Sequence, residues 1–418
     1  SGAVHDFSKT AVEFVKGFTA GWNLGNTFEN LDASKVGNIT PTEAETMKWN
    51  PVTTKAMIDT VKAQGFNVVR IPCTWMMFVS EQNGVYTIDN AYLNRVQEVV
   101  DYCYDNDMYV ILNMHHDDNE WLDITKTGDA WNAVKNEYAQ LWTQIANRFK
   151  TYDARLILEG ANEIIARSPS GDDWWGNDNS YFTRLNELHA LFVNTVRGTG
   201  GNNAQRYLMI PTYGAQFYSH QMSKLVIPNN DSRVIVDVHW YTSGTDVEVL
   251  ENTFSLFDSY FIDKNIAMVL GECGLLNSES NEKKAEWGDA FIGLATQHGI
   301  KCLLWDDGGN YKILNRSACT WACDTYVNAV VSNAFCGNAF AVSALPAQQY
   351  TGSALTPAVS VAGCTENVDY TVTYVNNVNI GRAVVYVSGI GDYAGYANTL
   401  YLYITPAGVS PPTTTAPG

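Results

Sequence analysis

Residues 108–114 read Met-Tyr-Val-Ile-Leu-Asn-Met, a short and almost continuously apolar run that is followed directly by two histidines. A strand with one face in water would alternate apolar and polar side chains, so this run predicts a parallel strand that is buried on both faces. Seven further runs of the same kind occur along the chain. They lie at 18–24, 67–72, 156–161, 206–211, 233–239, 267–272 and 301–306.

A longer amphipathic segment follows each of these eight runs. We expect helices at 53–64, 90–106, 132–150, 180–198, 215–224, 247–264, 281–298 and 323–333, of which 215–224 has the weakest pattern. Eight strand–helix repeats predict an α/β fold, the (β/α)8 TIM barrel. An open doubly wound sheet is the alternative, although the first run lacks the GxGxxG turn that dinucleotide-binding sheets of that kind carry.

The sequence changes character after residue 340. Short runs of alternating apolar and polar residues, separated by Gly- and Asn-rich turns, predict a small all-β sandwich of the immunoglobulin-like type. These runs lie at 357–362, 369–375, 382–388 and 399–404. We therefore divide the chain into a barrel domain, a linker, a β-sandwich and a Pro/Thr-rich tail, at 1–340, 341–352, 353–407 and 408–418. The tail resembles a linker, and we expect that a further module can follow it.

Composition excludes several classes of partner. The chain has 418 residues, 46% of them hydrophobic, which is enough for a large core. Its 26 Lys and Arg against 44 Asp and Glu give a net charge of −18, so nucleic acid and anionic membranes are repelled while a neutral polymer is not. The sequence contains no run of 18 apolar residues, so we predict no membrane span. The eight cysteines lack CxxC spacing, which argues against structural zinc and leaves disulfide pairing open.

Two glutamates stand where a barrel carries its chemistry, at the carboxyl ends of the strands. Glu163 follows the fourth run and Glu272 ends the seventh. If their carboxyl groups lie about 5–5.5 Å apart, one can attack an anomeric carbon while the other protonates the leaving oxygen. Either glutamate alone could equally be a solvated loop residue; the matched pair favours catalysis.

Polar and aromatic residues end the neighbouring runs. Arg70 requires an anionic partner in the barrel, and we expect it to pair with Glu272 and to lower the pKa of that carboxyl. Tyr241 could donate a hydrogen bond to Glu272, histidines could bind sugar hydroxyls, and Trp305 could lie under a sugar ring or simply pack in the core. The alternative for residues 115–118, His-His-Asp-Asp, is a metal site.

Taken together, these stretches resemble glycoside hydrolase family 5, the large cellulase family, over roughly residues 10–335. The matching motifs are Gly21–Thr27, Val69–Pro72, Asn113–His116, Ala161–Glu163, His239–Tyr241, Gly271–Glu272 and Leu304–Asp306. Three further features, Trp49–Thr54, Trp75 and Leu314–Ser317, are similar to the endoglucanase and xyloglucanase branch of that family. The middle residue of His239–Tyr241 is Trp, where the family often has Tyr or Phe.

The resemblance implies a role for each residue. Glu163 is expected to be the acid/base and Glu272 the nucleophile of a retaining mechanism that needs no metal and no cofactor. Asn162 is expected to bind the sugar 2-hydroxyl, and Trp305 to form a stacking platform. The supporting residues are expected to be Asn26, Arg70, His115, His116, His239 and Tyr241.

The implied activity is that of a secreted, monomeric endo-β-1,4-glucanase that acts on plant cell-wall β-glucan. Xyloglucanase, mixed-linkage glucanase and mannanase activity would suit the same residues. Two alternatives from other classes stay open, a metal-dependent barrel hydrolase centred on His115 and His116, and a glycan-binding protein without turnover.

The small domain resembles bacterial immunoglobulin-like repeats, on Tyr350-Thr351-Gly352 and Gly391-Asp392-Tyr393-Ala394-Gly395. We expect either a spacer or a glycan-binding role through Tyr393, Tyr396 and Tyr401.

Overall fold

The computed structural model describes residues 5–334, 340, 342–393 and 396–408. The chain divides into two compact units, Ser1–Ala334 and Phe335–Gly418. The predicted division into a barrel domain 1–340, a linker 341–352 and a β-sandwich 353–407 stays a prediction. The predicted tail lies outside the described residues from 409 onward.

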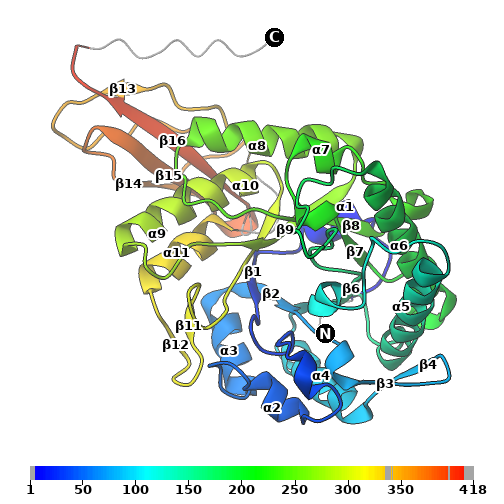
Figure 1. Cartoon of the computed structure of the whole chain (residues 1–418). Coiled ribbons are helices and arrows are strands. Elements are labelled where there is room, and N and C mark those ends of the chain that lie inside the picture. The colour runs from blue at the N-terminus through cyan, green and yellow to red at the C-terminus, as the bar shows by residue number, and fades with distance from the viewer. Residues whose placement is uncertain (1–4, 335–339, 341, 394–395, 409–418) are drawn as a thin grey trace. The chain divides into compact units, whose positions relative to one another are not determined.

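The first unit is a closed barrel of eight parallel strands (Figure 1). The strands are β1 (Ala20–Asn23), β2 (Phe66–Ile71), β5 (Tyr109–Asn113), β6 (Leu156–Glu159), β7 (Leu208–Pro211), β8 (Val234–His239), β9 (Ala267–Cys273) and β10 (Lys301–Leu304). Each coincides with one predicted run. β1 pairs with both β2 and β10, with Gly21 opposite Val68 on one side and Leu303 on the other. The TIM-barrel prediction is therefore confirmed, and the open-sheet alternative is wrong.

Helices follow the strands around the barrel. They are α3 (Lys55–Gln64), α4 (Asn90–Asp105), α5 (Gly128–Arg148), α6 (Asn179–Gly198), α7 (Ser219–Met222), α8 (Val247–Tyr260), α9 (Asn281–Trp287), α10 (Gly293–Gln297) and α11 (Asp324–Asn333). The predicted helix 215–224 shrinks to the four residues of α7, because Ala215 has a positive φ angle of 51° and the backbone is extended at Gln216 and Tyr218. A right-handed helix permits neither conformation. A π-helical turn, Gly288–Ile292, separates α9 from α10.

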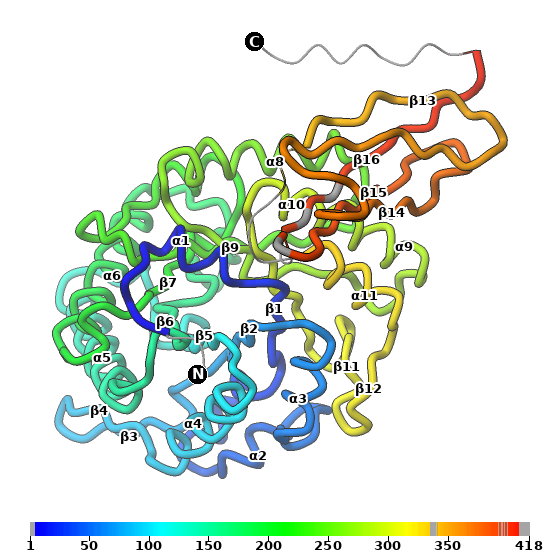
Figure 2. Tube along the Cα trace, turned by 180° about the vertical axis from the view of Figure 1, so that it is seen from behind, coloured from blue at the N-terminus to red at the C-terminus, as the bar shows by residue number. Residues whose placement is uncertain are grey.

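Short helices and two β-hairpins lie at the two ends of the barrel. α2 (Pro41–Glu45) and the hairpins β3–β4 (Val79–Gln82 and Val85–Ile88) and β11–β12 (Leu314–Asn315 and Thr320–Trp321) lie in loops between barrel elements. α1 (Ala11–Val15) precedes the first strand, and Figure 2 shows it across the end of the barrel that faces away in Figure 1. Phe14 and Phe18 of this segment belong to the core cluster inside the barrel, so α1 closes the amino-terminal end of the barrel.

The barrel interior has two layers. The lower layer is apolar and fully buried, and it consists of Val68, Ile111, Ile157, Met209, Ile235, Val269 and Leu303. Side chains alternate between the two faces of a strand, so the residues two positions later also point inward. They are largely polar, and they include Arg70, Asn113, Glu159 and Asp237, all with no exposed surface.

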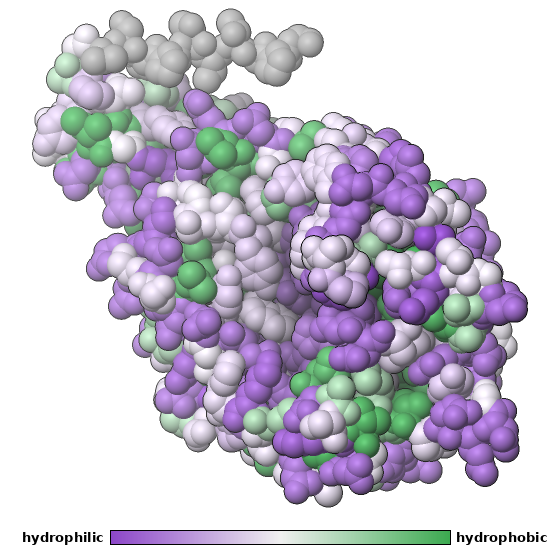
Figure 3. Space-filling view, in the orientation of Figure 1, coloured by the Kyte–Doolittle hydropathy of each residue, from purple (hydrophilic) through white to green (hydrophobic). Residues whose placement is uncertain are grey.

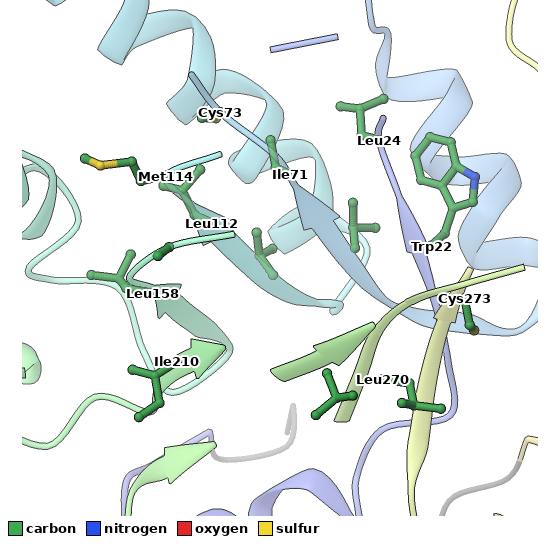
Figure 4. Packing of buried hydrophobic residues seen from close by; sticks show 14 of the residues in the cluster. Trp22, Leu24, Ile71, Cys73, Leu112, Met114, Leu158, Ile210, Leu270 and Cys273 are labelled. Carbon is green, nitrogen blue, oxygen red and sulfur yellow. The ribbon is translucent and has the colours of Figure 1, made fainter. Parts of the chain in front are cut away.

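The intervening residues point outward and pack against the helices, as Ile71, Leu112, Leu158, Ile210 and Leu270 show in Figure 4. Each fully buried apolar side chain of this size stabilises the fold by about 1.5–3 kcal/mol. The polar layer therefore has the apolar layer below it and the outward-facing apolar side chains around it.

The second unit contains one four-stranded sheet in the order β13–β16–β15–β14. The strands are β13 (Gln348–Gln349), β14 (Tyr370–Val375), β15 (Gly381–Gly389) and β16 (Ala397–Thr405). Three of the four predicted runs form these strands. The fourth, 357–362, contributes a single bridge between Val361 and Val342, so the described residues show one sheet of the expected sandwich. The immunoglobulin-like assignment stays a prediction.

Two other sequence features can be compared with the described residues. No helix among them is both long and apolar enough to cross a bilayer. The seven cysteines that are described, Cys73, Cys103, Cys273, Cys302, Cys319, Cys323 and Cys364, are free thiols. Cys336 lies outside the described residues.

Candidate active site

Arg70 organises the polar layer from the end of β2. Its guanidinium donates to both oxygens of Glu159, at 2.7 and 2.9 Å, and to Glu272 Oε1 at 2.7 Å. It also donates to the side-chain oxygens of Asn23 and Asn162, at 3.1 and 2.9 Å. A planar guanidinium with five N–H donors suits such a site. One buried cation thereby fixes groups from β1, β6, β9 and the loop after β6.

The two predicted catalytic glutamates meet at this layer. Glu163 follows β6 and Glu272 lies in β9, and His239 at the end of β8 lies between them. His239 Nδ1 is 2.7 Å from Glu163 Oε1 and 3.5 Å from Glu272 Oε2. One ligand atom from each of the three side chains lies within 4.8 Å of those of the other two. The structure thus brings together carboxyl groups 109 positions apart in the sequence.

Glu272 is held at both oxygens. Oε1 accepts from Arg70, and Oε2 accepts a 2.8 Å hydrogen bond from the Tyr241 hydroxyl. Burial raises the pKa of Glu272 above its usual value and the neighbouring Glu163 adds to this rise, although His239 and Arg70 oppose it. We predicted the pairing with Arg70 correctly, but the predicted net lowering of the pKa is wrong because desolvation outweighs the cation.

Tyr241 remains a hydrogen-bond donor. Burial of its hydroxyl, and then the charges of Glu272 and Glu163, raise the pKa of Tyr241 well above its usual value. The phenol is therefore protonated at neutral pH and donates its hydrogen bond to Glu272.

His115 and Trp305 form one wall of the site. Their rings are parallel, with centroids 5.9 Å apart and an interplanar angle of 5°. Asn113 Oδ1 accepts from the Cys73 amide, so its Nδ2 faces His115 Nδ1 at 2.9 Å. Burial, and then the nearby cations, hold the pKa of His115 well below its usual value. His115 is therefore neutral, accepts at Nδ1 and carries its proton on Nε2.

His116 lies beside His115, edge to face at a centroid distance of 4.5 Å. Its backbone amide donates to Thr74 Oγ1 at 3.2 Å. Burial lowers the pKa of His116 to about 4, so it too is neutral near pH 7. This places His116 next to the wall of the site, whereas the contacts described for its imidazole do not reach the Arg70 network.

Asn26 lies outside that network. Its backbone N–H donates to Glu29 and its carbonyl accepts from Asn50 Nδ2 at 2.9 Å. The asparagine that Arg70 contacts is Asn23, three residues earlier, whose Nδ2 also donates to the Gly271 carbonyl at 2.9 Å. Asn26 thus shapes the loop after β1, and its predicted contact with substrate stays a prediction.

The sequence analysis missed two buried acids, Glu159 and Asp237. Asp237 Oδ2 lies 2.9 Å from His239 Nε2, and its Oδ1 accepts from the Gly271 amide at 2.9 Å. The signal was present in the spacing, since Asp237 precedes His239 by two residues on one strand and therefore shares its inward face. Glu159 ends β6 with the same inward orientation.

The predicted metal alternative can be compared with the donor geometry. In residues 115–118 the acids have other partners, since Asp117 accepts from the Trp75 and Met76 amides and Asp118 lies 3.6 Å from Arg167. Over the described ranges, the donors close enough to share a cation are those of Glu163, His239 and Glu272. Both ring nitrogens of His239 already face carboxylates. This arrangement suits proton exchange better than metal binding.

The mouth of the barrel is hollowed and largely polar. Figure 3 views the end opposite α1, where pale and purple side chains line a central depression and apolar side chains form separate patches. Exposed tryptophans lie in loops at this end, Trp49 with 57%, Trp174 with 41% and Trp175 with 49% of their surface accessible. Trp49 Nε1 is fixed by the Asp307 carbonyl at 2.8 Å, and Trp175 stacks on His220 at 4.7 Å.

Comparison with known proteins identifies this arrangement. The family model described as cellulase, glycosyl hydrolase family 5, matches residues 30–310. Endoglucanase B of Clostridium cellulovorans is 37% identical over 352 residues, which are 78% of this chain and 76% of that protein.

Solved structures agree. A broad-specificity endoglucanase of group GH5-4 from Ruminococcus champanellensis, with bound cellotriose, is 38% identical and superposes with a TM-score of 0.73 over 77% of this chain and 98% of that one. A xyloglucan-specific endo-β-1,4-glucanase from a metagenomic library, in complex with cellotriose, is 34% identical with a TM-score of 0.71, over 78% and 99%. This chain therefore belongs to glycosyl hydrolase family 5, the cellulases, and is a glycoside hydrolase.

Proposed function

We propose that this chain is a retaining endo-β-1,4-glucanase that cleaves internal bonds of plant cell-wall β-glucans, with Glu163 as acid/base and Glu272 as nucleophile. The observation that carries the proposal is the approach of donor atoms of Glu163 and Glu272 to within 4.8 Å. Retaining glycosidases hold their two carboxyl groups about 5–5.5 Å apart, whereas inverting enzymes leave about 6.5–9.5 Å for a water molecule.

In the first step Glu272 attacks the anomeric carbon and Glu163 protonates the leaving oxygen. Arg70 and Tyr241 occupy both oxygens of Glu272, so the attacking atom is oriented before substrate arrives. Oε1 of Glu163 faces His239, which leaves Oε2 to exchange the proton. The products of this step are a glycosyl ester on Glu272 and a released chain end.

In the second step Glu163, now ionised, takes a proton from water, which attacks the same carbon and frees Glu272. Arg70 holds Asn162 by its side-chain oxygen, so the amide NH2 of Asn162 can donate to the sugar 2-hydroxyl. Hydrogen bonds at that hydroxyl strengthen in the transition state. Trp305, parallel to His115, would stack on the sugar before the cleaved bond.

An open cleft supports endo action. Trp49 and Trp175 lie in loops after different strands and are exposed, with one face of Trp175 stacked on His220. Exposed aromatic side chains suit the apolar C–H faces of pyranose rings. The relatives include a broad-specificity endoglucanase and a xyloglucan-specific one. We extend the proposal to substrates with glucose backbones, substituted or mixed-linkage glucans included.

The test is a rate comparison on carboxymethylcellulose, mixed-linkage β-glucan, xyloglucan and glucomannan, with the anomeric proton of the first product followed by NMR. We expect β-configured product from at least one glucan, and a fall in viscosity that precedes the release of reducing ends. α-Configured product would contradict retention, and a chelator that stops turnover would instead favour the metal-dependent alternative. Binding without any turnover would favour a glycan-binding protein.

We also propose that the enzyme is secreted as a monomer and that its β-rich second unit is a spacer. A polymer too large to enter cells must be met outside them, which supports secretion. Removal of residues 341–418 should then leave the rate on soluble xyloglucan unchanged, whereas a loss of binding to insoluble cellulose would assign glycan binding to that unit.

A further inference from the structure

Beneath the two catalytic glutamates lies a second, fully buried pair of acids. Glu159 and Asp237 both have 0% of their surface exposed. They come from β6 and β8, alternate strands of the barrel, whose inward side chains fall in one layer. Glu159 faces Arg70 through both oxygens, and Asp237 Oδ2 lies 3.9 Å from the same guanidinium. With Glu272, three carboxyl groups surround Arg70 and His239, so the buried charges of one guanidinium and one imidazolium balance only when one carboxyl group carries a proton.

The charges of the buried groups indicate which acid holds that proton. Burial raises the pKa of Glu159 and the neighbouring Asp237 adds to this rise, although Arg70 opposes it. Burial also opposes ionisation of Asp237, but His239, Arg70 and Glu159 outweigh it and lower its pKa. If Glu159 is neutral, the charges of Arg70 and a protonated His239 balance those of Asp237 and Glu272.

Asp237 also fixes the geometry around the site. It holds His239 Nε2 at 2.9 Å, and the other nitrogen of that ring lies 2.7 Å from Glu163. Its second oxygen accepts from the amide of Gly271, the residue before Glu272. A Cβ atom at position 271 would lie 2.1 Å from that oxygen, so glycine is required for this contact. Asp237 thereby contacts His239, which faces Glu163, and the backbone next to Glu272. Its own side chain is fully buried.

We propose that Asp237 is a positioning residue that keeps His239 as an imidazolium donating to Glu163, and that Glu159 is the protonated partner that keeps the buried cluster neutral. The inference rests on the proposed function of Glu163 and goes beyond it. The imidazolium makes Glu163 a stronger acid toward the leaving oxygen, and it stabilises the carboxylate that remains afterwards.

The titratable groups around this chain of contacts are few. His239 faces Asp237, Glu163 and Glu272. Asp237 faces Arg70 at 3.9 Å, besides His239 and Glu159. In Asp237→Asn, we expect the amide oxygen to keep the Gly271 contact, so the NH2 group faces His239 Nε2, which must then accept. His239 becomes neutral, with its single proton on Nδ1.

The experiment is the pH dependence of kcat/KM on a soluble glucan for the whole chain. Loss of the imidazolium charge raises the pKa values of both Glu163 and Glu272, because a nearby cation favours the ionised form of a carboxyl group. We expect both limbs of the profile to move to higher pH by about one unit in Asp237→Asn, which is about tenfold in rate at a fixed pH on a limb. On a dinitrophenyl cellobioside, whose leaving group needs no proton, the loss of kcat should be several times smaller.

Glu159→Gln is the matched variant. Glutamine is neutral like a protonated glutamate, and its NH2 group can donate to Asp237 while its oxygen accepts one of the two hydrogen bonds that Arg70 donates at this position. Its profile should stay within about 0.3 units of the wild type, whatever its kcat. If Glu159→Gln moves the limbs of the pH profile and Asp237→Asn does not, the assignment of the proton is reversed and the proposal fails.

Asp306→Asn controls for loss of a buried carboxylate, because Asp306 binds Trp22 and backbone amides outside this cluster. This variant should lower Tm without moving the limbs of the pH profile.

A readout independent of hydrolysis separates this inference from the proposed function. The chain has 7 histidines, so ¹⁵N-labelled imidazole resonances can be assigned by substitution. His239 should show imidazolium shifts at pH 7 in the wild type and neutral shifts at the same pH in Asp237→Asn. A neutral His239 in the wild type would overturn the proposal even if the enzyme hydrolyses glucan, and an inactive wild type with imidazolium at His239 would overturn only the function.

Discussion

The barrel carries an apolar layer and a polar layer on the same strands, two residues apart. Ile157 and Ile235 in the lower layer contact only other apolar groups, whereas Glu159 and Asp237 above them each have named polar partners. Apolar packing is non-directional, so volume is what matters in the lower layer. A buried charge requires each of its partners in place. On these strands the residues that stabilise the barrel and the residues that carry its chemistry lie only two positions apart, on the same inward face.

The largest effect is expected in the polar layer, at Glu272. In Glu272→Gln the proposed nucleophile is lost while Arg70 and Tyr241 keep a side chain of the same shape. We expect kcat on soluble glucan to fall by at least about 10⁴-fold and binding of cellotetraose to stay within about threefold, as measured by calorimetry. Wild-type turnover in this variant would remove Glu272 from the mechanism.

The next effect is expected at Glu163, which tests the division of labour between the two carboxyl groups. Glu163→Ala should lower kcat on glucan by about 10²–10⁴-fold, the usual contribution of general acid–base catalysis. On a dinitrophenyl cellobioside the first step needs no acid, so formation of the glycosyl-enzyme should keep its wild-type rate and appear as a burst. Added azide should accelerate the second step by replacing water, which needs a base. Equal losses on both substrates would contradict the assignment of the acid.

A third prediction concerns the apolar layer. Ile157→Ala should lower the free energy of unfolding by about 2–4 kcal/mol, because it removes buried methyl groups and leaves a cavity. The rate per folded molecule at 25 °C should change less than tenfold, since Ile157 has no polar partner in the site. Urea denaturation and kcat on the same preparation measure both quantities. A folded variant as inactive as Glu272→Gln would show that the layers are not separable.

The sequence predicted the strands and their order, because each buried strand is a local apolar run such as 108–114. It also predicted Glu163 and Glu272, because the carboxyl ends of all strands meet at one end of a barrel. The pairing of Glu159 with Asp237 could not be predicted, since it joins two strands across the interior and depends on the register of the closed sheet. The predicted helix 215–224 is wrong over its first residues because Ala215 is left-handed and Gln216 and Tyr218 are extended, which the composition of the segment does not reveal.

The smallest expected effect is on the thermal stability of the Glu272→Gln variant. Burial and the neighbouring Glu163 raise the pKa of Glu272, so the folded protein binds this proton more tightly than the unfolded chain does. Ionised Glu272 therefore lowers stability above the pKa of about 4.3 of an unfolded glutamate, and the loss grows until the raised pKa is passed. Glu272→Gln carries no such charge, so its Tm should exceed that of the wild type at pH 7. The difference should vanish as the pH falls to about 4.

Glu98→Gln is the control for the direction of this change in Tm. At Glu98 hydrogen bonds from Tyr102 and Arg95 lower the pKa, so Glu98→Gln should lower Tm at pH 7 and lose its effect in acid. Thermal melting of both variants between pH 4 and pH 7 would measure the contrast. Equal signs would mean that the Glu272 carboxylate is stabilised by Arg70 and Tyr241 more than burial opposes it. The expected opposite signs would show that ionised Glu272 is held in the polar layer at a cost in stability.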